Sequence, residues 1–214
     1  MVIRDWSSDV CSSDLDGGTN GANPASYTIV TATINLASAT KAGSAFGGWY
    51  DNAGFTGSAI TQIASGSSGN RTLYAKFVPV YTVAYVSSGQ TGGSVPASQT
   101  KTHGVDLTLA TNGTLVKTGY YIANWNTASD GSGTGYAPGG TYNADSSVTL
   151  YAQWALQPYY ITYYGLNGGE THSNPTVYYI NSGTITLTAP TARADNTFIA
   201  WVSNDTGIKV VDPN

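Results

Sequence analysis

The chain repeats one sequence pattern three times at a nearly constant spacing. Three of its five tryptophans, Trp49, Trp125 and Trp201, are evenly spaced, with a step in numbering of 125 − 49 = 76 and again 201 − 125 = 76. Solenoid and propeller repeats measure roughly 20–50 residues, so a repeat of this length is instead typical of a small domain. We therefore predict that the chain is a tandem array of small modules.

A second pair of segments supports this spacing. Leu73-Tyr-Ala-Lys-Phe77 recurs as Leu150-Tyr-Ala-Gln-Trp154, with nearly the same step (150 − 73 = 77). Near the start of each repeat stands a Gly-Gly pair, which follows Asp16, Thr91 and Asn167 in turn. These anchors place repeat 1 at residues 15–77, repeat 2 at 80–154 and repeat 3 at 159–214.

Residues 1–14 match nothing in the other two repeats. They lack the apolar stretch and the cleavage site of a signal peptide, and the string from Asp5 to Leu15 resembles translated sequencing-adapter DNA. We interpret this segment as a non-native leader, with a natural disordered leader as the alternative. On this interpretation repeat 1 lacks its first strand, of which Leu15 remains. Repeat 3 lacks its last strand, and repeat 2 is complete.

The composition favours strands over helices. Thr, Tyr, Val and Ile suit pleated strands, while the 26 Gly and 8 Pro suit turns. No stretch of about 11 residues holds a helical period. Alternation in the last strand of repeat 2 predicts that Leu150, Ala152 and Trp154 face the core. We predict a mainly β fold with little helix.

The strand that carries the tryptophan needs an irregularity. Phe46 and Trp49, like Ile122 and Trp125, are three residues apart and would lie on opposite faces of a regular strand. A β-bulge would bring each pair onto one face; apolar cover on both faces is the alternative. We favour a bulge at Gly47-Gly48 and at Ala123-Asn124. The predicted structural anchors of the repeats are Trp49, Trp125, Trp201, Tyr74, Tyr151, Phe77 and Trp154.

The polar residues do not suggest catalysis. His103 and His172 fall in different repeats, and no acidic position is shared by all three, so we predict neither a metal site nor paired catalytic carboxylates. The segment Asp130-Gly-Ser-Gly-Thr lacks the ligand spacing of a calcium loop and is interpreted as a glycine-rich turn. No phosphate-binding motif is present. We predict no enzyme activity, no catalytic or metal-binding residue and no cofactor.

Charge and hydropathy exclude two classes of partner. Lys and Arg number 8 and form no basic cluster, which argues against nucleic acid. No apolar run approaches the ~20 residues of a membrane-spanning helix.

The single cysteine, Cys11, excludes an internal disulfide framework.

The joint pattern resembles that of a known family. Gly-Gly, Pro, Leu, Gly-Tyr-x-Ile/Phe-x-x-Trp and Leu-Tyr-Ala-x-Trp follow in the order of the Listeria–Bacteroides repeat, also called the internalin B-repeat-like module. The matching segments begin at Phe46, Leu73, Gly119, Asp130 and Leu150, and the resemblance covers Leu15 to Asn214. Repeat 3 departs from the pattern at Ala194-Asp-Asn. The resemblance implies β-grasp-like modules, strung in tandem in extracellular or envelope proteins of bacteria and often beside adhesion domains.

Two functions follow as hypotheses, with an unrecognised enzyme as a third. The first is a non-enzymatic spacer, and also an adhesive module, of a bacterial cell-surface or secreted protein. Its partners would be neighbouring repeats and a surface protein or glycan. The alternative is a set of carbohydrate-binding modules appended to an extracellular enzyme, in which exposed tyrosines stack on sugar rings. The candidate stacking residues are Tyr74, Tyr151, Tyr163 and Tyr178.

Overall fold

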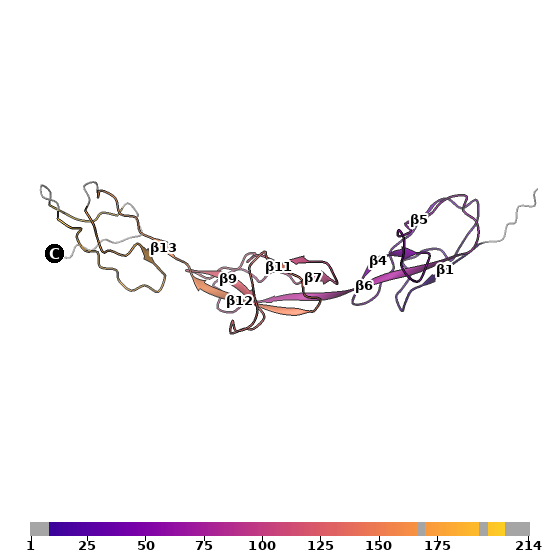
Figure 1. The fold of residues 1–214 in the computed structure, drawn as a ribbon, viewed down its shortest axis with the longest axis horizontal. Helices are drawn as coiled ribbons and strands as arrows, with labels where there is room; N and C mark the ends of the chain where they lie inside the picture. The colour runs from indigo at the N-terminus through magenta and orange to yellow at the C-terminus, as the bar shows by residue number, and fades with distance from the viewer. Residues whose placement is uncertain (1–8, 167–169, 193–196, 204–214) are drawn as a thin grey trace, which may run out of the picture.

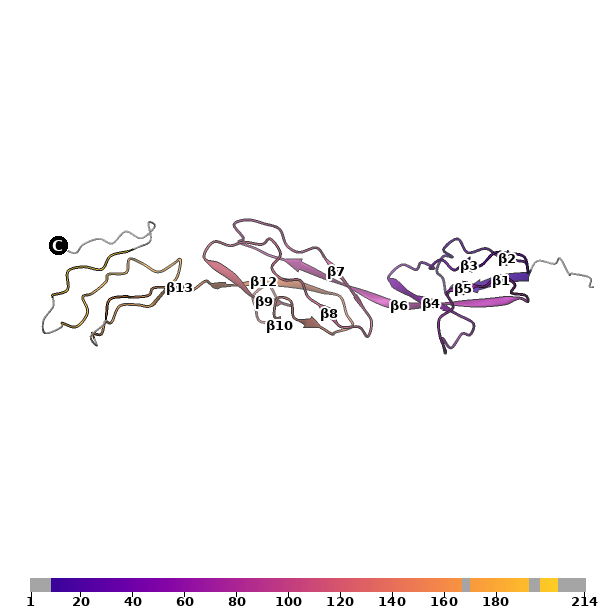
Figure 2. The same cartoon turned by 90° about the horizontal axis from the view of Figure 1, so that it is seen from above.

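The computed structural model describes residues 9–166, 170–192 and 197–203. Figures 1 and 2 show three modules that follow one another in a row along the longest axis, and in Figure 1 the row forms a shallow arc. They correspond to the three sequence repeats and are called modules 1, 2 and 3. The described residues form 14 strands and no helix. The predicted mainly β fold with little helix is confirmed.

Module 1 is built around the first half of the long strand β6. Strand β1 pairs parallel with β6, and β4 pairs antiparallel with it on the other side. Strand β2 extends this sheet by pairing with β1, while β3 and β5 form a separate ribbon. The strands are β1 (Asp9–Asp14), β2 (Ser26–Tyr27), β3 (Ile34–Asn35), β4 (Ser44–Tyr50), β5 (Gln62–Ile63) and β6 (Arg71–Val86).

Module 2 repeats this plan around the second half of β6. The strands lie in the order β7-β6-β12-β9-β10, where β6 and β12 are parallel and the other neighbours are antiparallel. A separate ribbon joins β8 to β11, and in module 3 β13 pairs with β14. The strands are β7 (Gln99–Thr102), β8 (Leu107–Thr108), β9 (Tyr120–Asn126), β10 (Gly135–Tyr136), β11 (Thr141–Tyr142), β12 (Val148–Leu156), β13 (Tyr159–Tyr160) and β14 (Val177–Tyr178). These strand pairings do not test whether the modules are β-grasp-like, so that part of the expectation stays a prediction.

The position of the first strand in module 1 is occupied by β1. Ser13 pairs with Leu73 there as Tyr85 pairs with Leu150 in module 2. β1 consists of leader residues, and it can take this position because strand pairing is made by backbone groups that nearly any sequence offers. That repeat 1 lacks a first strand of its own stays a prediction. The non-native origin of the leader stays a prediction, and its residues 1–8 lie outside the described part of the chain.

Strand β6 runs from module 1 into module 2 without a break. Pro79 stands at the boundary, and its carbonyl accepts a hydrogen bond from His103 N at 2.9 Å. On the other side, Val80 N donates to the carbonyl of Gly43 at 3.1 Å. The boundary backbone is therefore held by both modules. Between modules 2 and 3 the strand is interrupted at residues 157–158.

The predicted bulges are present in β4, which carries Trp49, and in β9, which carries Trp125. In β4 the pairing register shifts between Phe46 and Gly48, and in β9 it jumps from Asn124 to Ile122. Each shift turns the tryptophan and the preceding apolar residue into one core. The core of module 2 consists of Val83, Tyr85, Leu109, Leu115, Ile122, Trp125, Tyr142 and Leu150, with Ala152 and Trp154 packed against it as predicted.

Candidate functional site

Each module holds its tryptophan by the same hydrogen bond. The indole Nε1 of Trp49 donates to the carbonyl of Ala37, that of Trp125 to Ala110 and that of Trp201 to Thr188, each at 2.9 Å. Trp49 and Trp125 are almost completely buried. A buried indole N–H needs an acceptor, and this carbonyl provides it in all three modules.

An amide side chain holds the same backbone segment in every module. Asn23 accepts from Ala37 N at 2.7 Å and donates to Ala37 O at 2.9 Å. Asn174 binds both backbone groups of Thr188 in the same way. In module 2, Gln99 accepts from Ala110 N at 3.0 Å and donates to Thr108 O at 3.0 Å.

This amide is a recurring residue that the sequence analysis missed. Asn23, Gln99 and Asn174 follow nearly the step of the tryptophans (99 − 23 = 76 and 174 − 99 = 75), so the periodic signal was present. The recurring amide is not found when only titratable residues are compared between repeats, because an amide does not titrate. Its role is to fix the backbone segment whose carbonyl binds the tryptophan.

A tyrosine packs edge-on against the tryptophan in modules 2 and 3. The ring of Tyr85 lies 4.7 Å from that of Trp125, and Tyr163 lies 5.0 Å from Trp201. Burial raises the pKa of both tyrosines, and for Tyr85 a hydrogen bond with the Ala110 backbone partly offsets the rise. The Tyr163 hydroxyl donates to Pro175 O at 2.8 Å. Tyr163 thus faces the interior of module 3.

The other three candidate stacking residues lie in different modules. Tyr74 belongs to module 1, where it pairs with Tyr50 of β4, and Tyr151 belongs to module 2, where it pairs with Asn126 of β9. The ring of Tyr178 stacks on Tyr159 at 5.3 Å in module 3. The four tyrosines are therefore not brought together into one site.

A basic residue lies over the last-strand aromatic in modules 1 and 2. Lys41 Nζ is 5.6 Å from the ring centre of Phe77, and Lys117 Nζ is 5.8 Å from that of Trp154. These are cation–π distances. Lys41 and Lys117 keep the step of the tryptophans (117 − 41 = 76), and the same step leads to Arg193, which lies outside the described residues. The period of these basic residues was not predicted from the sequence either.

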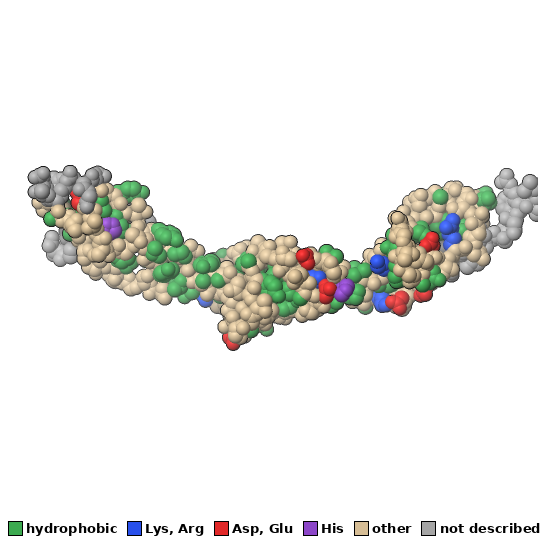
Figure 3. Space-filling model, viewed as in Figure 1, with side chains coloured by type: hydrophobic (Ala, Val, Ile, Leu, Met, Phe, Trp, Pro, Cys, Tyr) green, Lys and Arg blue, Asp and Glu red, His purple; other side chains and the backbone are tan. Residues whose placement is uncertain are grey.

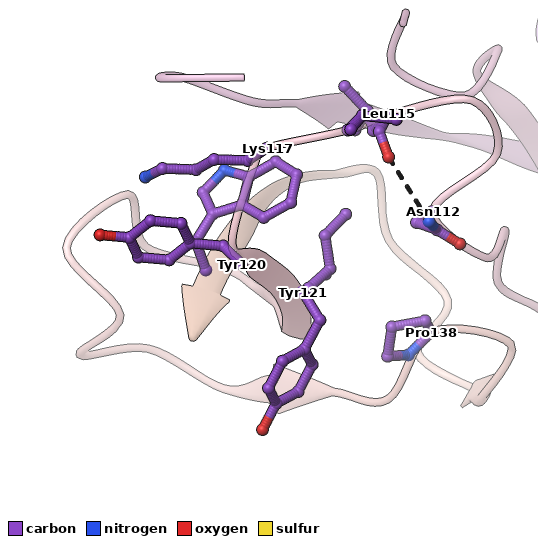
Figure 4. Close-up of a pocket in the computed structure, with 9 residues that line it drawn as sticks. Asn112, Leu115, Lys117, Tyr120, Tyr121 and Pro138 are labelled. Atoms are coloured by element: carbon purple, nitrogen blue, oxygen red, sulfur yellow. Dashed lines mark hydrogen bonds between the residues drawn. The ribbon is translucent and has the colours of Figure 1, made fainter. Parts of the chain in front are cut away.

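Lys117 also borders a groove on module 2, shown in Figure 4. Its Nζ lies 4.3 Å from the ring centre of Tyr120. The groove has a volume of about 360 Å³, and its apolar lining includes Tyr121, Pro138 and Trp154. The Tyr121 side chain is 47% exposed. Aromatic faces beside a cation and the amide of Asn112 are suited to a small ring-shaped polar ligand.

An ion pair between a buried lysine and a partly exposed aspartate joins β7 to the loop before β12. Lys101 is 1% exposed, and its Nζ lies 2.6 Å from Asp145 Oδ1 and 2.9 Å from Thr102 O. Asp145 also accepts from Gly104 N and lies 3.0 Å from His103 Nδ1. The hydrogen bond from Lys101, followed by that from Gly104, holds the pKa of Asp145 below its ordinary value.

This cluster lies at the end of module 2 that adjoins module 1, and Figure 3 shows charged and histidine side chains gathered there. Asp145 and His103 lie outside the strands. The burial of Lys101 was not predicted from the sequence, because lysine is rarely buried without a partner and its partner is 44 residues away.

The match to known families agrees with this repeated architecture. The Listeria–Bacteroides repeat domain matches residues 13–76, 81–153 and 159–214. The chain belongs to the Listeria–Bacteroides repeat family. Its three repeats are the three modules described above, and the tryptophan, the carbonyl that binds it and the amide recur in each of them.

Two relatives of this Listeria–Bacteroides repeat chain come from Evansella cellulosilytica. One, named "Putative Gly-rich membrane protein", is 29% identical over 174 residues, which cover 78% of this chain and 20% of the relative. The other, named "Putative membrane protein", is 38% identical over 117 residues, which cover 54% of this chain and 18% of the relative. The chain thus spans about a fifth of the length of each relative. No solved structure matches it.

The described part of the repeats contains no cluster of potential metal ligands and no helix that could span a membrane. No three His, Cys, Asp or Glu side chains within it lie close enough together to hold a metal ion. Asp130 accepts hydrogen bonds from the backbone and the hydroxyl of Ser132, which lower its pKa and close the turn. No helix that could cross a membrane occurs among the residues described.

Proposed function

We propose that the chain is a non-enzymatic tandem-repeat segment of a bacterial cell-envelope protein and acts as a spacer. The observation that carries the proposal is the course of the chain through module 2. It enters along β6 and leaves along the neighbouring parallel strand β12, so entry and exit lie at opposite ends of the module. Modules of this kind add length when they are joined in series, as Figure 1 illustrates.

The residues that recur favour a structural role. The tryptophans, the amides and the lysines that keep the period all bind or pack against parts of their own module. The names of the relatives support a place in the cell envelope. In such a position the array would hold other parts of the protein away from the cell surface. Weak contacts to a surface protein or glycan, repeated along the array, would add through effective concentration and make it adhesive.

Small-angle X-ray scattering of the chain tests the spacer. The expected result is an elongated particle, and a compact particle would contradict the proposal. Inserting Gly-Ser-Gly-Ser between Val78 and Pro79 interrupts β6 at the module boundary and is expected to shorten the average particle. The same insertion after Ser68, in an exposed loop of module 1, is the matched control and should leave the length unchanged.

The groove beside Lys117 favours glycan binding as a second candidate function. Tyr120, Tyr121 and Trp154 place aromatic side chains at this surface, and Lys117 would favour an acidic sugar. A glycan array with the intact chain tests it. Binding that Tyr121→Ala abolishes and that Tyr164→Ala in module 3 leaves unchanged is the supporting result. Absence of binding, or equal loss in both variants, would remove this candidate.

A further inference from the structure

We propose that module 2 is a mechanical clamp, so that the array is a tether that resists pulling as well as a spacer. This inference rests on the spacer function proposed above. The clamp is the parallel pair formed by β6 and β12, in which Val83 pairs with Val148 and Val86 with Tyr151.

The direction of force follows from the topology. In a tandem array, tension enters module 2 at the beginning of its β6 segment, near Val80, and leaves at the end of β12, at Leu156. Because the two strands are parallel neighbours, these points lie at opposite ends of the pair. Tension therefore slides one strand along the other and strains all the hydrogen bonds between them at once. Strands pulled from the same end would separate one bond at a time.

Side-chain hydrogen bonds extend the pair beyond both of its ends. Before the first paired residues, Thr82 N donates to Ser147 Oγ at 3.0 Å. Beyond the last, the indole Nε1 of Trp154 donates to Ser88 O at 3.1 Å. Each bond joins the β6 side to the β12 side, so each is strained by the same sliding motion.

The core opposes sliding as well. The side chains of Val83, Tyr85 and Leu150 at the paired positions are buried. A shift of one residue would turn the buried side chains of one strand to the outer face. The same burial keeps water from replacing the hydrogen bonds on the core side, where they are stronger than in water. Sliding thus has a high barrier, and forced unfolding is governed by the rate of crossing that barrier.

The force also has a direct path between modules. Strand β6 continues through Pro79, whose carbonyl accepts from His103 N, while Val80 N donates to Gly43 O. In module 1, β1 and β6 form a second parallel pair, from Cys11–Arg71 to Asp14–Tyr74. One strand therefore takes part in two such clamps in series, and no flexible linker separates them.

Single-molecule pulling in two directions tests the clamp. In both versions of the chain Cys11→Ser removes the native thiol, and one handle is attached to the C-terminus. The first version carries the second handle at Pro79→Cys and slides β6 along β12. The second carries it at Gln90→Cys, an exposed position after β6, and peels the strands apart. The released length, about 3.5 Å per residue, identifies module 2, because residues 79–156 or 90–156 become extended.

We expect the sliding direction to need a several-fold higher rupture force than the peeling direction. Ser147→Ala should lower the sliding force and leave the peeling force unchanged, since the Thr82–Ser147 bond is the last to open on peeling. Ser129→Ala, at an exposed position outside the pair, should change neither. Equal forces in the two directions, or a sliding force that Ser147→Ala leaves unchanged, would overturn the clamp. The unloaded length measured by scattering reports on the spacer separately, so a chain that is long but ruptures equally refutes only the clamp.

Discussion

The ammonium group of Lys101 lies 2.6 Å from the carboxylate of Asp145, and the Lys101 side chain is only 1% exposed. A buried charge is tolerated when a partner of opposite charge and further hydrogen bonds satisfy it. Here Thr102 O accepts a second bond from Lys101, and Gly104 N donates to Asp145. The pair ties β7, the second strand of module 2, to the loop that leads into its last strand.

We predict that Asp145→Asn lowers the melting temperature of module 2 at pH 7. We also predict that the melting temperature of this variant falls less steeply as the pH is lowered. The pKa of Asp145 is lower in the folded protein than its ordinary value. Its ionised form therefore stabilises the fold above the ordinary pKa of about 3.9, and this stabilisation is lost as the pH falls through the lower folded pKa. Thermal unfolding followed by circular dichroism at pH 7 and at successively lower pH checks this.

The neighbouring Asp106, which is exposed, provides the control for that experiment. Asp106→Asn should melt like the unchanged chain at every pH. Parallel acid profiles for the unchanged chain and Asp145→Asn would contradict the role given to the Lys101–Asp145 pair.

We predict that Trp125→Phe destabilises module 2 by about 1–3 kcal/mol, through loss of the indole hydrogen bond and of core packing. Ala110 O keeps only the longer bond from Gly139 N, at 3.4 Å. Phenylalanine keeps an aromatic ring but cannot donate to Ala110 O, and its smaller ring leaves a void in the core. Urea unfolding followed through NMR signals of module 2 measures this, because separate modules need not unfold together. Tyr121→Phe, at an exposed position, is the control and should change the free energy of unfolding by less than about 0.5 kcal/mol.

We predict that Gln99→Leu destabilises module 2 and that Gln99→Asn costs less. Leucine removes the Gln99 amide that accepts from Ala110 N and from the Tyr85 hydroxyl and donates to Thr108 O. Ala110 N keeps its bond to the Tyr85 hydroxyl, so the expected cost is that of the lost hydrogen bonds, about 0.5–1.5 kcal/mol each. Asparagine is the residue that modules 1 and 3 use at this position. Urea unfolding ranks the two variants, and equal losses would show that the amide contributes through its size alone.

We predict that Gly93→Ala prevents module 2 from folding, while Gly104→Ala is tolerated. Both glycines have positive φ, +76° and +71°. A Cβ at Gly93 would lie 1.8 Å from Thr114 O, whereas one at Gly104 would meet no atom within 4 Å. Gly104→Ala therefore costs only the left-handed backbone strain of roughly 1–2 kcal/mol. Amide NMR spectra distinguish the outcomes, since dispersed module 2 signals in Gly93→Ala would contradict the close approach.

The parts of the fold that were predictable are those that repeat or alternate. The spacing of Trp49, Trp125 and Trp201 predicted three modules, and the family match agrees with it. Three-residue spacing between Ile122 and Trp125 predicted the bulge, because both residues needed the same face. Alternation predicted the inward positions of Leu150, Ala152 and Trp154. The modules are recognised because one pattern recurs along the chain, and the bulge and the inward positions because they depend on residues close together in one strand.

The missed features depend on residues far apart. Nothing near Lys101 in the sequence indicates that Asp145 will satisfy its charge. The recurring amides and lysines were visible as periods, but their meaning came only from their contacts with Ala37, Ala110 and Phe77. The pairing of β1 with β6 escaped the repeat comparison because it is made through backbone groups.

A row of β modules with a recurring tryptophan could be predicted from the residues alone, since repetition and alternation are properties of the chain that need no long-range information. That β6 is shared by two modules and lies beside the parallel strand β12 follows from the three-dimensional fold and from no local pattern. Val83 and Val148 stand far apart in the sequence, and their strands are joined by backbone hydrogen bonds that are the same whichever side chains the strands present. The feature on which the spacer and the clamp depend is therefore absent from any local pattern of residues.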